Sequence, residues 1–401
     1  MGLALSQKPR MDSLSEFRDW AHLPPEIVDL ISEKVNYIVD YVRFRAVCST
    51  WRSASRPKPR HLPPQLPWLM LPYDGYSWTT KDDTTRFFYD VWESKMREIH
   101  LPETEVMTCC ASYLGWLLLV SYKGRQVSLL NPLTRCQIEL PPFSTWFDPY
   151  MISFGMTKMT FSADLTDPNC LITALLEDNC VMSCQVGDRS WKRYYYQSKE
   201  LADVTCYNGR LYFLYQGEMV IIEYNKSEHK GVLEPELIGA VVVLADLDFL
   251  DDDDEPNYIA AVELTVLLDP ELAAVEKYFV EGKSGVSVVG FHPEGKFMLY
   301  QFQEQQMKLE KITIDSTAIF YGDNYPCLAL SSDDWDSLDG GSLYMEHRRV
   351  PDALKLAAVK SGYHTKFARM VDGNVMYWYD INQESPYHQA APAMWFQPSF
   401  F

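Results

Sequence analysis

The sequence lacks the features that mark several large classes of protein. It has no secretory signal and no apolar run of about 18 residues, so it gives no support for export or for stable insertion in a membrane. It also has no glycine-rich phosphate-binding loop, no G-x-S-x-G turn and no pair of histidines at metal-ligand spacing. We therefore expect no catalytic residue, no metal site and no cofactor.

Positive charge is in the minority. The chain has 36 Lys and Arg against 55 Asp and Glu, a formal net charge of -19 at pH 7. Because an acidic chain repels phosphate backbones, we expect a protein partner and no nucleic acid. Carboxylates are densest from Asp246 to Glu255, but this run lacks the glycine and the distal glutamate of an EF-hand calcium loop. We interpret it as a solvated loop, with docking of a basic partner as the alternative.

The nine cysteines form no C-x-x-C pair, so no standard zinc site is indicated. Cys136, Cys170, Cys206 and Cys327 lie within apolar runs, where a thiol usually behaves as a small buried hydrophobe. We predict that these four are reduced and buried, as in a cytoplasmic or nuclear protein.

The first residues match one targeting pattern. Met1-Gly2 followed by Ser6 fits N-myristoylation at Gly2. A single acyl chain gives only marginal membrane binding, and the alternative is an unmodified, flexible extension over residues 1–18.

The stretch around which the chain is organised runs from Trp20 to Ser55. Leu23-Pro24-Pro25 predicts the start of a helix, since proline suits a first helical turn. Ile27, Leu30 and Ile31 recur at a spacing that places them on one helical face. The opposite face is predicted to carry the polar residues Glu26, Asp29, Ser32 and Glu33.

After a polar break around Asn36, a second apolar stripe predicts one further helix. The stripe consists of Tyr41, Phe44, Val47, Cys48 and Trp51. Helices this short cannot bury enough surface to be stable alone and need something to cover their apolar face. We interpret the stretch as an adaptor surface, and a helical hairpin packed on its own domain is the alternative.

Leu23-Pro24, Ile27, Asp40 and the run from Ala46 to Arg52 resemble an F-box. The resemblance, placed at residues 19–56, implies docking on the Skp adaptor of an SCF-type ubiquitin ligase and, through Skp, on a cullin. Carried over from the F-box pattern, the expected Skp contacts are Leu23, Pro24, Ile27, Leu30, Ile31, Val47, Cys48 and Trp51.

Prolines are dense from Arg56 to Pro72, which predicts a domain boundary. Apolar residues between the prolines, including Leu66 and Trp68, favour a packed linker at 57–72 over a loose one. The second domain is then expected at 73–401.

From Tyr73 onward, short apolar runs alternate with turn residues, which predicts β-hairpins. One hairpin is expected at 115–130 and another at 203–215, with its turn at Asn208-Gly209. Further strand pairs are predicted at 170–186, 277–291 and 296–314. Such units recur about every 40 residues, as in a four-stranded propeller blade, although an antiparallel sandwich would give a similar pattern.

Two groups of residues narrow the fold. The segments 129–135 and 138–142 are similar to the "NPLTR … LPP" element of plant F-box proteins with β-propeller receptors. Residues 317–324 and 393–399 resemble late signatures of the KIB-type β-propeller. The expected fold class is mainly β with a small N-terminal α domain, a helical F-box followed by a β-propeller.

The resemblance implies a non-catalytic substrate-receptor subunit. In this interpretation the F-box docks on Skp, and the propeller holds a target protein for ubiquitination in the cytoplasm or nucleus. One alternative is an F-box scaffold or inhibitor that blocks its target without degrading it. Another is an enzyme that uses the channel of the propeller, although no paired acids or nucleophile locate such a site.

Overall fold

The structure divides between Pro63 and Pro64 into a helical unit and a strand-rich unit. The computed structural model describes residues 20–71, 84–90, 93–121, 126–143, 156–176, 180–195, 201–223, 242–245, 257–260, 262–281, 285–292, 297–313, 316–322, 325–335, 338, 340–346, 364–371, 374–384 and 394–400. The expected extension at 1–18, Gly2 and the acidic run from Asp246 to Glu255 lie outside these residues. The predictions for them stay predictions.

The helical unit contains a 3-10 turn and three short helices. They are η1 (Trp20–His22), α1 (Pro25–Ser32), α2 (Ile38–Ala46) and α3 (Ser49–Ala54). Pro24 precedes α1, and its carbonyl accepts the N–H groups of Ile27 and Val28 at 3.0 and 3.1 Å. The proline-initiated helix is thus confirmed.

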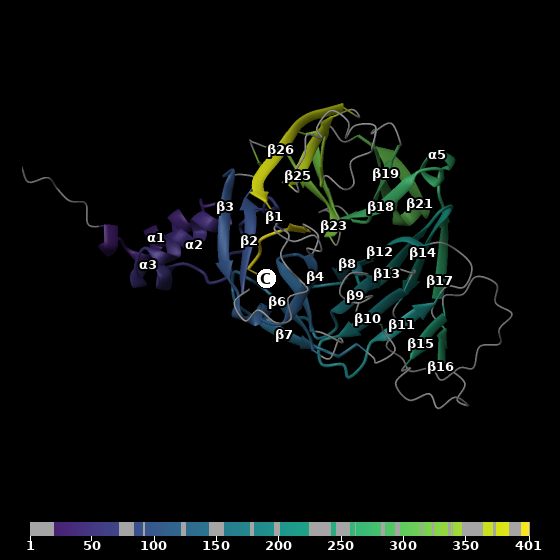
Figure 1. Ribbon diagram of the computed structural model, residues 1–401, viewed down its shortest axis with the longest axis horizontal. Coiled ribbons are helices and arrows are strands. Elements are labelled where there is room, and N and C mark those ends of the chain that lie inside the picture. The colour runs from purple at the N-terminus through teal and green to yellow at the C-terminus, as the bar shows by residue number, and fades with distance from the viewer. Residues whose placement is uncertain are drawn as a thin grey trace, which may run out of the picture. The chain divides into compact units, whose positions relative to one another are not determined.

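The strand-rich unit is built from mainly antiparallel sheets that follow one another round a ring (Figure 1). The first sheet contains β1 (Trp68–Met70), β2 (Thr85–Asp90), β3 (Lys95–His100) and β27 (Met394–Phe396). The second contains β4 (Met107–Tyr113), β5 (Trp116–Ser121), β6 (Val127–Leu130) and β7 (Gln137–Leu140). A short 3-10 turn, η2 (Pro102–Thr104), lies between them in the chain.

The third sheet contains β8 (Met156–Phe161), β9 (Leu171–Leu176), β10 (Cys180–Gln185), β11 (Lys192–Tyr195), β15 (Val242–Ala245) and β16 (Asn257–Ala260). The fourth contains β12 (Leu201–Tyr207), β13 (Arg210–Tyr215), β14 (Glu218–Glu223) and β17 (Val262–Leu267). The chain therefore leaves the fourth sheet after β14, adds two strands to the edge of the third, and returns as β17.

The fifth sheet joins two modules through a parallel pairing of β18 with β23. One module contains β18 (Glu276–Glu281), β19 (Ser287–Phe291), β20 (Phe297–Gln303) and β21 (Lys308–Ile312), flanked by α5 (Pro270–Ala273) and η5 (Glu304–Gln306). The other contains β22 (Thr317–Gly322), β23 (Tyr325–Ser331), β24 (Ser342–Glu346), β25 (His364–Val371) and β26 (Asn374–Glu384). Within the described residues the ring thus has six modules.

The ring closes through strands from distant parts of the chain. β27 pairs antiparallel with β1, which aligns Leu69 with Trp395. Along the inside of the ring, β27 lies beside β4, β4 beside β8, β8 beside β12, and β12 beside β18. The parallel pairing of β18 with β23 and the contact of β23 with β27 complete the circle. The mainly β fold class with a small N-terminal α domain is confirmed, and the sheets have the arrangement of a propeller.

Predicted strand pairs are confirmed wherever the structure describes them. β5 pairs with β6, β9 with β10, β12 with β13, β18 with β19, and β20 with β21. Asn208 and Gly209 both have positive φ, 48° and 74°, as a two-residue hairpin turn requires.

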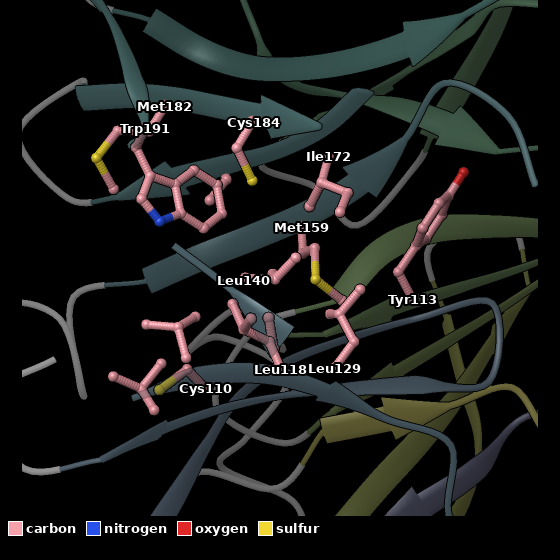
Figure 2. Close-up of a cluster of buried hydrophobic side chains, with 14 of the residues drawn as sticks. Cys110, Tyr113, Leu118, Leu129, Leu140, Met159, Ile172, Met182, Cys184 and Trp191 are labelled. Carbon is pink, nitrogen blue, oxygen red and sulfur yellow. The ribbon is translucent and has the colours of Figure 1, made fainter. Parts of the chain in front are cut away.

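The packing between neighbouring sheets supplies the core (Figure 2). Cys110, Leu118 and Leu129 of the second sheet face Met159 and Ile172 of the third. At the edge of this cluster Trp191 stacks on Phe143 and donates its Nε1–H to the Pro141 carbonyl at 2.8 Å. An apolar layer of this kind holds successive blades together, because each sheet buries its two faces only against its neighbours.

The structure moves the predicted linker boundary. The sequence predicts a packed linker at 57–72, whereas Trp68–Met70 form the buried strand β1, which pairs with β2 and β27 in the first sheet. A three-residue strand flanked by prolines gives too short an alternation to recognise in sequence, and its partner β27 lies more than 300 residues away.

The cysteine prediction is right for three residues and wrong for one. Cys170, Cys206 and Cys327 are buried free thiols, whereas Cys136 is exposed. Cys136 comes just before β7, directly after Arg135, whose φ of 62° belongs to a turn. It therefore lies at a turn on the protein surface and not inside the strand that follows.

Candidate protein-docking surface of the helical unit

The core of the helical unit uses one narrow side of α1. Val28 and Ser32 of α1 are buried. The buried side chains of α2 are Ile38, Tyr41 and Phe44. Ser32 was predicted to lie on the exposed polar face, and that prediction is wrong. Its hydroxyl donates to the Asp29 carbonyl at 2.7 Å, so the serine is buried with its polar atom satisfied.

The apolar face predicted for α1 is largely uncovered by the rest of the described chain. Ile27 is 43% exposed and Leu30 is 57% exposed, while Ile31 is half-buried at the margin of the core. Pro24 is exposed and Leu23 is half-buried at the start of the helix. Large aliphatic side chains left in water on one face are typical of a surface that binds another protein.

The second predicted helix is two helices. Cys48 is extended, with φ of -161° and ψ of 171°, and its Sγ accepts the N–H of Trp51 at 3.5 Å as the N-cap of α3. This break turns Trp51 back onto Phe44, with ring centroids 4.5 Å apart. The sequence could not show the break, because the apolar spacing continues through it.

The remaining predicted contact residues lie around this break. Val47 is 58% exposed, and Cys48 and Trp51 are half-buried. Both α1 and α2 pack against α3. The packing of these short helices therefore places the predicted contact residues of α1 and those around the start of α3 in one small unit.

Other hydrogen bonds fix the end of the unit. The Tyr41 hydroxyl donates to the Arg56 carbonyl at 2.9 Å, and the His61 Nε2 lies 3.1 Å from the Val35 carbonyl. Arg45 binds both the carbonyl and the hydroxyl of Ser55. These bonds connect the helices to the segment that follows them.

Sequence reasoning missed two exposed apolar residues, Trp20 and Val42. Trp20 forms part of η1, and its carbonyl accepts the Nε1–H of Trp51 at 2.9 Å, so η1 is tied to α3. A tryptophan three residues before Leu23-Pro24 was a visible signal, because tryptophan is enriched where proteins bind one another.

Neither a metal cluster nor a membrane-spanning helix is found in the described part of the chain. No group of three His, Cys, Asp or Glu side chains in these residues could hold a metal ion. No helix among them is long and apolar enough to cross a membrane.

The fold and the exposed helical surface define a two-part protein, a small helical unit followed by a β-propeller. The KIB1-4 beta-propeller family matches residues 88–378, and the chain belongs to this family. It is similar to the F-box protein SKIP23 of Arabidopsis thaliana, with 26% identity over 81% of this chain and 83% of that protein. It is also similar to the Arabidopsis thaliana F-box protein At2g17036, with 24% identity over 79% and 80% of the two chains. The resemblance to plant F-box proteins with a KIB-type propeller is thereby confirmed.

Proposed function

We propose that the protein is a substrate-receptor subunit of an SCF-type ubiquitin ligase. The helical unit docks on a Skp adaptor, and through it on a cullin, while the propeller binds a target protein for ubiquitination. The role is non-catalytic, because proximity between the target and a charged conjugating enzyme is what a receptor contributes. We expect it to act in the cytoplasm, the nucleus or both.

One observation carries the proposal. Of the eight residues expected to contact the adaptor, Pro24, Ile27, Leu30 and Val47 are exposed, although three of them are large and apolar. The names of the relatives as F-box proteins support the same assignment. Exposed aliphatic side chains contribute to binding because they are removed from water when the partner covers them.

Co-purification with a plant Skp adaptor tests the docking. We expect the double substitution Leu23→Ala and Pro24→Ala to reduce adaptor capture strongly, since Leu23 loses its packing and α1 loses its preset start. Leu267→Asp is a matched control, because Leu267 is a large exposed aliphatic residue of the propeller. Unchanged capture by the Leu23/Pro24 variant would overturn the assignment of this surface.

The second candidate is an F-box scaffold or inhibitor that binds its target without degrading it. It shares the same docking surface and differs only in outcome. The half-life of a captured target after depletion of this protein separates the two. A longer half-life supports the ligase receptor, and an unchanged half-life favours the scaffold.

A further inference from the structure

A buried ion pair lies between two inner strands of the propeller. Lys158 of β8 and Asp203 of β12 have side chains that are 6% and 2% exposed, and Nζ lies 2.8 Å from Oδ2. They belong to the third and fourth sheets. Burying two charges is costly in free energy. A buried ion pair therefore requires close contact between its two charges and further hydrogen bonds to each of them.

The aspartate supplies those bonds and brings in a third strand. Its Oδ2 also accepts the backbone N–H of Phe279 in β18 at 2.7 Å, and its Oδ1 accepts the N–H of Val204 at 2.7 Å. The Lys158 ammonium lies 5.9 Å from the centre of the Phe279 ring. One carboxylate therefore connects the third, fourth and fifth sheets.

Both charged residues follow a local break in strand register. The pairing of β8 with β9 shifts between Met156 and Lys158, and that of β12 with β13 shifts between Leu201 and Asp203. Such bulges re-aim a side chain away from the regular alternation of a strand. Two independent bulges that each precede one member of the same pair indicate that the strands are shaped to bring these charges together.

The electrostatics agree with a fixed pair. Burial raises the pKa of Asp203, and the Lys158 ammonium and the Phe279 and Val204 N–H groups oppose that rise. Removal of either partner leaves the other as an uncompensated buried charge. Replacement of both by neutral groups relieves the cost of both.

We propose that the Lys158–Asp203 pair is a positional lock that fixes the third, fourth and fifth sheets in a single arrangement around the ring. The lock does not depend on the proposed ligase function.

A double-mutant cycle on the full chain tests the lock. We expect Lys158→Met and Asp203→Asn each to lower the midpoint of thermal unfolding by roughly 5 °C. In the double variant, we expect a smaller loss than the sum of the two, because no buried charge remains and the amide side chain introduced by Asp203→Asn still offers an oxygen to the backbone. Glu304→Gln is the control, since its exposed pair with Arg210 also joins neighbouring modules and should change the midpoint little.

Hydrogen exchange adds a readout specific to the lock. In Asp203→Asn, amides of β8, β12 and β18 should exchange faster while those of β4 to β7 stay unchanged, and the double variant should recover. If a single variant fails to fold but the double variant folds, the lock is supported. Additive midpoint losses, exchange that rises equally in all sheets, or failure of all three variants to fold would overturn it.

Discussion

Gly115 lies in the turn between β4 and β5, and the C-terminal segment packs directly on it. Its φ is +86°, a left-handed conformation that favours glycine. A Cβ at this position would lie 2.6 Å from the Ser399 Cβ and 2.9 Å from the Ser399 nitrogen. Asn131 holds the same segment, donating from Nδ2 to the Ser399 carbonyl at 2.9 Å. The turn at Gly115 and the segment at Ser399 can therefore approach this closely because the glycine side chain is only a hydrogen atom.

We predict that Gly115→Ala lowers the free energy of unfolding by about 2–5 kcal/mol, the sum of left-handed strain and overpacking. Gly187→Ala is the matched control, because Gly187 has φ of +92° but nothing within 4 Å of the added Cβ. It should cost only the strain, about 1–2 kcal/mol. Denaturant unfolding of both variants measures the difference, and equal losses would contradict the contact with Ser399.

At this scale, sequence predicts burial only where the regular pattern holds. Cys170, Cys206 and Cys327 are buried as apolar neighbours indicated, but a turn exposes Cys136. Ser32 is buried because its hydroxyl has a partner within its own helix turn. The hydrophobicity of the sequence predicts neither the exposure of Cys136 nor the burial of Ser32, because the first depends on a local turn and the second on a local hydrogen bond.

At the scale of the element, α1 has a buried side and an exposed apolar side. Val28 and Ser32 face the core of the helical unit, and Ile27 and Leu30 are exposed. The sequence identified the amphipathic helix and its start but not which side is buried. Consecutive residues on a helix are separated by about 100° around its axis. A shift of one position along α1 therefore moves a side chain from the buried side to the exposed side.

This division predicts opposite effects for adjacent residues. Val28→Ala should destabilise the helical unit by about 2 kcal/mol through the loss of two buried methyl groups, and should speed amide exchange in α1. Ile27→Ala should leave exchange in α1 nearly unchanged and weaken adaptor binding. Hydrogen exchange with mass spectrometry on the full chain measures both. Equal protection in the two variants would contradict the assignment of the two sides.

Among the strands, local pairing was predictable and distant pairing was not. Hairpins such as β12 with β13 are indicated by a turn such as Asn208-Gly209. The pairing of β11 with β15 has no such signal, because about 50 residues separate the two strands. The pairing of β1 with β27 has no such signal either, because more than 300 residues separate these two strands in the sequence.

The whole molecule contains a closed ring of sheets and a helical unit with an exposed apolar surface. Trp395 of β27 is fully buried and donates its Nε1–H to the Tyr321 carbonyl at 3.1 Å, so the closing strand also contacts the last module. The pairing of β27 with β1 completes the first sheet, and packing of each sheet on its neighbours stabilises this large all-β unit. In the proposed function, the propeller presents a fixed surface to a target while the helical unit recruits the ligase.

The most direct test is a titration of the purified full-length chain with a plant Skp adaptor by calorimetry. The wild-type chain should bind, and Ile27→Asp combined with Leu30→Asp should weaken binding at least about 10-fold, because carboxylates replace two exposed apolar contacts. Leu267→Asp should bind like the wild type. Equal affinity of the wild-type chain and the Ile27/Leu30 variant, or no binding by the wild-type chain, would contradict the proposed function.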